Sequence, residues 1–225
     1  MDEVEQDMAR RSYGYGRWDA PYWFIGPEEG QAPGENNDLK RRHEAFCQLG
    51  KDGLSDCRTF HELINETRFH REERPALQPA WRRLMLLLMA FSEKLTGEKL
   101  KDDEILRAYQ RDRWGSSVGE TCVIELSGLP SRSFKEPRDR KSFRPERVEF
   151  ISRKMCACKP KFVVMYGISE KKHWEKIAGR ALRKNDVRKV ESTIIAFAPH
   201  PVAFGTKDQD WRKLGQRLRL ESGRS

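Results

Sequence analysis

Residues 161–167 (KFVVMYG) place five apolar side chains in a row and end at a glycine. A short apolar run bounded in this way is typical of a strand that is buried on both faces of a sheet. Residues 21–26 (PYWFIG), 122–126 (CVIEL) and 193–198 (TIIAFA) have the same character. The sequence therefore predicts four buried strands, and residues 187–190 are a candidate edge strand.

Segments with helical periodicity separate these strands. Apolar strands that alternate with helices indicate a parallel sheet covered on both faces. We expect a protein of the α/β class, a three-layer α/β/α fold with a central, mostly parallel four-stranded sheet. Residues 1–20 are expected to be a flexible N-terminal segment, and residues 21–225 a single domain. The expected helices are residues 38–49, 59–66, 79–95, 102–114, 144–158, 169–178 and 208–220.

The composition points to a polyanionic partner. Lys and Arg number 44 against 35 Asp and Glu, which gives a formal charge of +9. Basic groups release counterions from a nucleic acid, although a merely soluble basic protein can carry the same charge. The longest apolar run, residues 84–91, is too short to span a bilayer, and the N-terminus has no apolar signal core. With five scattered cysteines, we expect a cytoplasmic protein without disulfides or membrane contact.

Polar turns follow the first and last predicted strands. Glu28 and Glu29 come directly after the first strand, and His200 lies between two prolines after the last. Because the carboxyl ends of parallel strands share one edge of a sheet, these groups are expected to converge. A carboxylate can position water or stabilise a cation, and an imidazole can hydrogen-bond a developing anion. Taken singly, the glutamates also fit a solvated loop, and the histidine a structural turn.

Three segments resemble motifs of the uracil-DNA glycosylase superfamily. Residues 24–30 (FIGPEEG) are similar to its first motif, residues 198–204 (APHPVAF) to its second, and residues 159–167 (KPKFVVMYG) to its penultimate core strand. The resemblance implies a DNA repair enzyme, a monomer without cofactor. Such an enzyme flips uracil or another deaminated base out of DNA and hydrolyses its N-glycosidic bond, leaving an abasic site.

The resemblance also implies roles for residues of the two motifs. Glu28 takes the place of the residue that positions water, and His200 that of the histidine that hydrogen-bonds the leaving base. Gly26 and Pro27 belong to the turn that holds the base. Glu29 stands where the family usually has proline, so either glutamate is a candidate for the catalytic carboxylate, and the register of the motif favours Glu28.

The base pocket departs from the family at Glu125, which aligns with a base-reading asparagine. Three explanations stay open: Glu125 is protonated, Ser127 reads the base, or the base is not uracil. A strand-end carboxylate with a purely structural role is a fourth. The nearest candidate for a stacking aromatic is Phe46, one helical turn after His43; ordinary helix packing explains these two residues equally well.

The expected DNA-facing surface lies beside the two motifs. Phe204 corresponds to the family's apolar wedge that fills the gap left by the flipped nucleotide, or else it is a buried aromatic. Residues 131–144 mix basic and aromatic side chains, which suits a strand of DNA but also a solvated loop. The expected DNA contacts are Ser131, Arg132, Lys135, Arg138, Arg140, Lys141 and Thr206.

The cysteines and histidines do not match a known cofactor pattern. Cys156-Ala157-Cys158 lacks the spacing of a Cys-x-x-Cys pair, so no iron–sulfur cluster is expected, and no zinc is expected either. Two rival functions remain. One is a catalytically inactive protein of the same fold that binds damaged or single-stranded DNA, and the other is an enzyme acting on free nucleosides.

Overall fold

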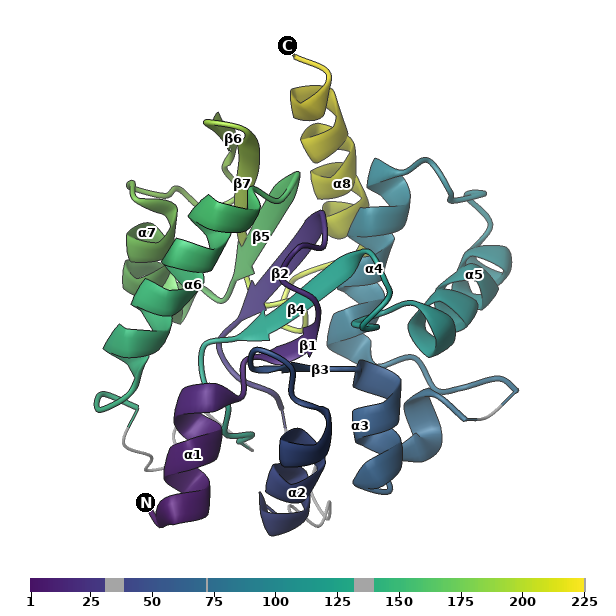
Figure 1. The fold of residues 1–225 in the computed structure, drawn as a ribbon. Coiled ribbons are helices and arrows are strands. Elements are labelled where there is room, and N and C mark those ends of the chain that lie inside the picture. Colours follow the sequence, from purple (N-terminus) through teal and green to yellow (C-terminus); the bar gives the residue numbers. More distant parts are fainter. Residues whose placement is uncertain (31–38, 72, 132–139, 225) are drawn as a thin grey trace.

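The computed structural model describes residues 1–30, 39–71, 73–131 and 140–224. Its centre is a seven-stranded mixed sheet (Figure 1). The α/β class is therefore confirmed, whereas the expected four-stranded sheet is wrong. The strands run β3-β1-β4-β2-β5-β7-β6 across the sheet, with bounds β1 Gly14–Gly16, β2 Tyr22–Gly26, β3 Leu54–Ser55, β4 Thr121–Glu125, β5 Phe162–Tyr166, β6 Val187–Val190 and β7 Thr193–Ala198.

The four strands that the sequence predicts as buried lie side by side. β4, β2, β5 and β7 are mutually parallel, while β1 and β6 are antiparallel to their inner neighbours. In the register, Gly26 pairs with Glu125, and Tyr166 pairs with Ala198. The turns after β2, β4, β5 and β7 consequently leave the sheet along one edge.

The first twenty residues differ from the expected flexible segment. They contain α1 (Glu3–Arg11), which begins at a capping box on Asp2 and buries Met8, followed by β1. Both glycines of β1 have positive φ, and a Cβ at Gly14 or Gly16 would come within 2.2 Å of a β4 carbonyl oxygen. Only glycine can adopt this conformation so close to a neighbouring strand.

Helices cover both faces of the sheet (Figure 1). Successive side chains of β2 alternate between two hydrophobic clusters: Phe24 packs with α4 and α8, while Trp23 and Ile25 pack with α6 and α7. No helix in the described ranges is long and apolar enough to cross a membrane. The helices are α1, α2 Leu39–Leu49, α3 Cys57–Leu63, α4 Pro79–Phe91, α5 Lys99–Asp112, α6 Arg144–Cys158, α7 Lys171–Ala178 and α8 Asp208–Ser222, with 3-10 turns η1 Thr67–Phe69 and η2 Ile168–Glu170.

Candidate functional site

A recess lies at the carboxyl edge of the sheet, beside β1 and β4. Its empty volume, including the mouth that opens to solvent, is about 350 Å³. Its walls come from several parts of the chain and include seven residues with polar side chains. They are formed by Met8, Ser12, Gly14, Tyr15, Glu29, Arg42, Ser55, Phe60, Glu125, Ser127 and Gly128.

Glu29 is the ionised acid of this recess. Arg42 donates to both of its carboxylate oxygens, at 2.9 and 3.1 Å, and the Tyr15 hydroxyl donates at 3.0 Å. Burial by itself raises the pKa of Glu29, but the charge and hydrogen bonds of Arg42, helped by His61 and Tyr15, bring that pKa below its ordinary value. Glu29 therefore keeps its negative charge at neutral pH.

Glu125, at the end of β4, has the opposite character. Burial, and then the charges of Glu29 and Glu28, raise its pKa well above the ordinary value. Its Oε2 atom is buried without a hydrogen-bond partner among the described residues. The backbone around it is fixed, because the buried guanidinium of Arg147 donates to the carbonyl oxygens of Glu125 and Leu126 at 2.6 and 3.0 Å. A neutral carboxyl group can both donate and accept a hydrogen bond.

The recess thus holds two carboxyl groups whose pKa values are shifted in opposite directions. Environments that separate the pKa values of two acids assign one of them as proton donor and the other as charge stabiliser or base. Pairs of this kind are the equipment of glycosidic bond hydrolysis. Both groups were candidates from the sequence, and the structure brings them into one recess.

Glu28 is enclosed elsewhere. Its carboxylate accepts from Ser131 Oγ at 2.8 Å and from two nitrogens of Arg140 at 2.8 and 2.9 Å. The side chain is only 4% exposed, and Glu28 is not among the described residues that line the recess. The motif register favours Glu28 as the catalytic carboxylate. The structure favours Glu29, because only Glu29 of the two lines the recess.

His200 lies further along the same edge, beyond β5. Its ring packs edge-on against Tyr166 at 5.5 Å, and the Tyr166 hydroxyl occupies the space over Gly26, where a Cβ would come within 2.2 Å of it. Tyr166 therefore stands between the first turn and His200, which is not one of the described lining residues. Nδ1 of His200 accepts from the Val202 N–H at 3.4 Å.

This contact fixes the proton of the imidazole. Burial lowers the pKa of His200 to about 4, so that the ring is neutral at pH 7. Because Nδ1 is an acceptor, the ring proton lies on Nε2, which is then a hydrogen-bond donor. Sequence reasoning predicted a histidine that hydrogen-bonds a leaving group, and this tautomer can do so.

The other expected base contacts separate into two groups. Ser127 lines the recess and exchanges hydrogen bonds with the backbone of Leu129 at 3.2 Å. The Pro27 carbonyl accepts from the Ser127 N–H at 3.0 Å, which joins the two turns. Phe46 packs in the hydrophobic core and is not a described lining residue, so its expected stacking role has no support from position.

The lining residues that sequence reasoning missed include Tyr15, Arg42 and Phe60. Tyr15 belongs to a strand too short and glycine-rich to be recognised, and Arg42 lies on a helix dense in basic residues. Phe60, whose ring meets that of Tyr15 at 5.5 Å, is the aromatic residue that lies where Phe46 was expected to. The only feature of the sequence that could have pointed to these residues is Tyr15, which stands between two glycines.

The expected DNA contacts fall in different environments. Arg132, Lys135 and Arg138 lie outside the described residues. Ser131 and Arg140 bind Glu28, whereas Lys141 is exposed.

The turn after β7 presents an apolar side chain to solvent. Phe204 is fully exposed, which rules out the alternative of a buried aromatic. Thr206 Oγ1 is bonded within this turn, to the Pro201 and Ala203 carbonyls at 2.9 and 2.7 Å.

Two groups of described side chains have the composition of metal ligands. One is Cys57, His61 and His70, all buried, and the other is Asp7, His43 and Cys47 nearer the surface. The first group adjoins the recess, because the His61 ring lies 5.3 Å from that of Tyr15. No protein-family model matches the chain, and no curated protein matches it.

Proposed function

We propose that the chain is a monofunctional DNA glycosylase, which hydrolyses the N-glycosidic bond of uracil or another deaminated base and leaves an abasic site. The observation that carries the proposal is the pair of carboxyls in one recess. Glu29 is bound by Arg42 and Tyr15, Glu125 is buried with one oxygen atom without a described partner, and their pKa values are shifted in opposite directions. The formal charge of +9 supports DNA as the partner. The resemblance of the two turns to glycosylase motifs is an independent argument for the same chemistry.

In the proposed reaction each carboxyl has one task. The Glu29 carboxylate, oriented by Arg42, stabilises the positive charge that gathers on the sugar and positions the attacking water. The neutral Glu125 carboxyl donates to a carbonyl oxygen of the leaving base and accepts from its N–H, as an amide would. No lysine lines the recess among the described residues, so hydrolysis without strand cleavage is expected.

The first experiment is excision from a defined oligonucleotide. Protein is incubated with single- and double-stranded DNA containing one uracil or hypoxanthine, and abasic sites are then cleaved with alkali. We expect cleavage at the lesion by the native protein and a loss of about 10²–10⁴-fold with Glu29→Gln. Glu28→Gln is the matched variant, since Glu28 is also held by an arginine but faces away from the recess; we expect it to lose far less.

Two results would change the assignment. If Glu28→Gln abolishes excision and Glu29→Gln does not, the water-positioning group is Glu28, as the motif register indicates. If the native protein cleaves none of these substrates but hydrolyses free deoxyuridine, it is a nucleoside hydrolase.

A second candidate function is DNA binding without catalysis. The buried Glu28–Arg140 ion pair favours this candidate. The motif register places the catalytic carboxylate at Glu28, and a carboxylate that is neutralised by arginine is a poor catalyst. This candidate predicts a gel shift of damaged or single-stranded DNA that weakens steeply with salt, and no abasic product.

A further inference from the structure

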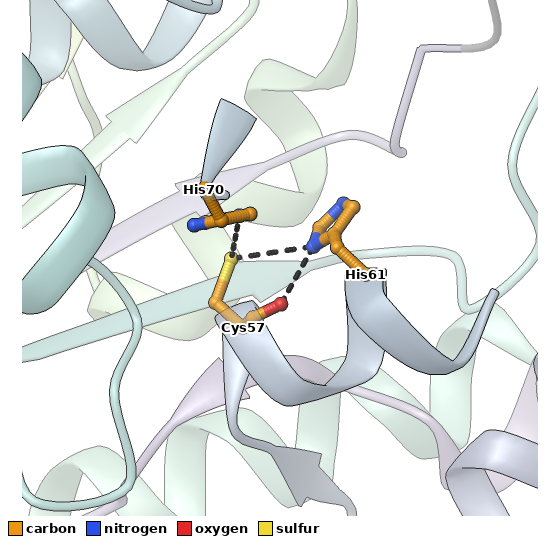
Figure 2. Close-up of side chains that lie close together, drawn as sticks. All are labelled: Cys57, His61 and His70. Carbon is orange, nitrogen blue, oxygen red and sulfur yellow. Dashed lines mark hydrogen bonds between the residues drawn. The ribbon is translucent and has the colours of Figure 1, made fainter. Parts of the chain in front are cut away.

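Three fully buried side chains beside the recess carry metal-ligating atoms. Cys57 and His61 lie one helical turn apart on α3 and so share a face, and His70 follows η1. Figure 2 shows the sulfur of Cys57 facing both imidazole rings. One ligand atom from each residue lies within 4.8 Å of the other two.

The distances within this cluster fit a shared ion. Cys57 Sγ is 3.6 Å from His61 Nδ1 and 3.8 Å from His70 Nε2. In a tetrahedral zinc site, bonds of about 2.3 Å to sulfur and 2.0–2.1 Å to nitrogen place these atoms about 3.6 Å apart. The sulfur is therefore already spaced from each of the two nitrogens as it would be in a zinc site.

The second cysteine–histidine group does not have this geometry. Asp7 Oδ2 lies 2.9 Å from His43 Nε2, and Cys47 Sγ lies 3.5 Å from the same nitrogen. A carboxylate–imidazole distance of 2.9 Å is that of a hydrogen bond, shorter than the spacing of about 3.3 Å between two tetrahedral ligands of zinc. This group is a hydrogen-bonded pair beside an exposed thiol, and it supplies the contrast for the test.

The surroundings of His61 also match a ligand histidine. Its Nε2 lies 4.0 Å from Glu29 Oε1, and metal-bound histidines usually direct their second nitrogen to a carboxylate. In the structure Nδ1 donates to the Cys57 carbonyl at 2.7 Å. Zinc would take the place of that proton, which would move to Nε2 and face Glu29, while the Cys57 thiol would release its own proton to solvent.

The His70 side chain is fully buried. Trp81 lies beside both imidazoles, with ring centroids at 5.5 Å from His61 and 6.1 Å from His70. A hydrophobic shell of this kind keeps water from competing for the ligands.

We propose that Cys57, His61 and His70 form a zinc site. The site ties the segment after η1 to α3 and adjoins Glu29 through His61. The proposal stands apart from the proposed function, because it rests on ligand geometry alone and is tested by metal binding rather than by excision.

The test measures metal in the whole protein. After dialysis against zinc and then against buffer, we expect about one zinc per chain by elemental analysis. Cobalt is the spectroscopic probe, because a cobalt–thiolate bond gives a charge-transfer band and tetrahedral cobalt gives intense visible bands. Cys57→Ser and His70→Gln should each weaken zinc binding by more than about 100-fold.

Two cysteine variants are the matched controls. Cys122→Ser alters a thiol that is equally buried but outside the cluster, and Cys47→Ser alters the thiol of the second group; both should retain the zinc and the cobalt spectrum. Loss of zinc with Cys47→Ser but not with Cys57→Ser overturns the proposal. If Cys57→Ser does not fold, the native protein decides: a cobalt complex without a thiolate band also overturns it.

Discussion

Glu28 and Glu29 are consecutive in the chain and are bound in the same manner, yet they have different surroundings. Arginine binds both oxygens of each carboxylate, Arg140 on Glu28 and Arg42 on Glu29, and a hydroxyl group adds a third contact. The Glu28 side chain is 4% exposed, whereas that of Glu29 is 25% exposed and lines the recess. Ion pairing therefore does not distinguish the two glutamates, and access to the recess does.

The difference arises from the direction of the chain after β2. Successive residues of an extended segment point to opposite sides, and the turn is held beside the segment after β4 by a bridge between Gly30 and Ser131. Glu28 is directed toward Ser131, and Glu29 toward β1 and α2. A shift of one residue in this turn would exchange their roles.

The largest expected effect comes from removing one arginine at a time. Arg42→Gln leaves Glu29 without its cation, so that its pKa rises and its orientation is lost. We expect the free energy of unfolding to fall by about 3 kcal/mol and the excision rate by about 10³-fold. Arg140→Gln is the matched change, because it should cost similar stability and much less activity. Chemical denaturation and single-turnover excision measure the two quantities.

One result would show that Glu28 and Glu29 do not differ in their contribution to excision. If Arg140→Gln reduces excision as strongly as Arg42→Gln while both proteins stay folded, then Glu28 and Glu29 act together. Access to the recess would then not distinguish them.

His200 tests whether the reaction extends beyond the recess. Its neutral ring is expected to donate from Nε2 to the leaving base, and loss of one such donor typically reduces the rate by about 10²-fold. His200→Ala should do so without shifting the pH profile between pH 6 and 8, because the pKa of His200 is about 4. A full rate in this variant would confine the chemistry to the β4 side of Tyr166.

Glu125→Gln tests whether Glu125 acts in its protonated form. Because burial raises the folded-state pKa of Glu125, folding favours its protonated form, and stability falls as pH rises from about 4.5 toward the folded-state value. Glutamine removes this dependence and keeps a donor and an acceptor, so neutral-pH excision should change by about 10-fold at most. The native protein should lose excision activity on the alkaline side, and the variant should not.

The core of this fold was predictable because its signal is local. Continuous apolar runs at residues 162–166 and 194–198 predict buried strands, and both lie in strands of the parallel core. β1 and β3 were missed, since three residues with two glycines and a pair of residues carry no periodicity. They are strands because of their contacts with β4 and with one another.

The candidate site was predictable in its position and not in its details. The order of strands implies that Glu29, Glu125 and His200 leave the sheet at one edge. That Tyr166 separates His200 from the recess depends on the direction of one side chain. The packing of α2 and α3 cannot be read from sequence spacing alone. This packing forms the Arg42–Glu29 pair and the cluster of Cys57, His61 and His70.

Phe204 carries the smallest expected effect and bears on DNA rather than on the chemistry. The side chain is fully exposed in the turn that also contains His200, and exposed apolar residues on such turns can insert into the gap left by a flipped base. Phe204→Ala should slow excision from duplex DNA roughly fivefold and leave single-stranded DNA unaffected, because a single strand has no stack to open. Exposed Val202 in the same turn is the control, and Val202→Ala should be neutral. Equal loss on both substrates would mean that Phe204 contacts the strand itself, which would place the DNA path across the His200 side of the edge.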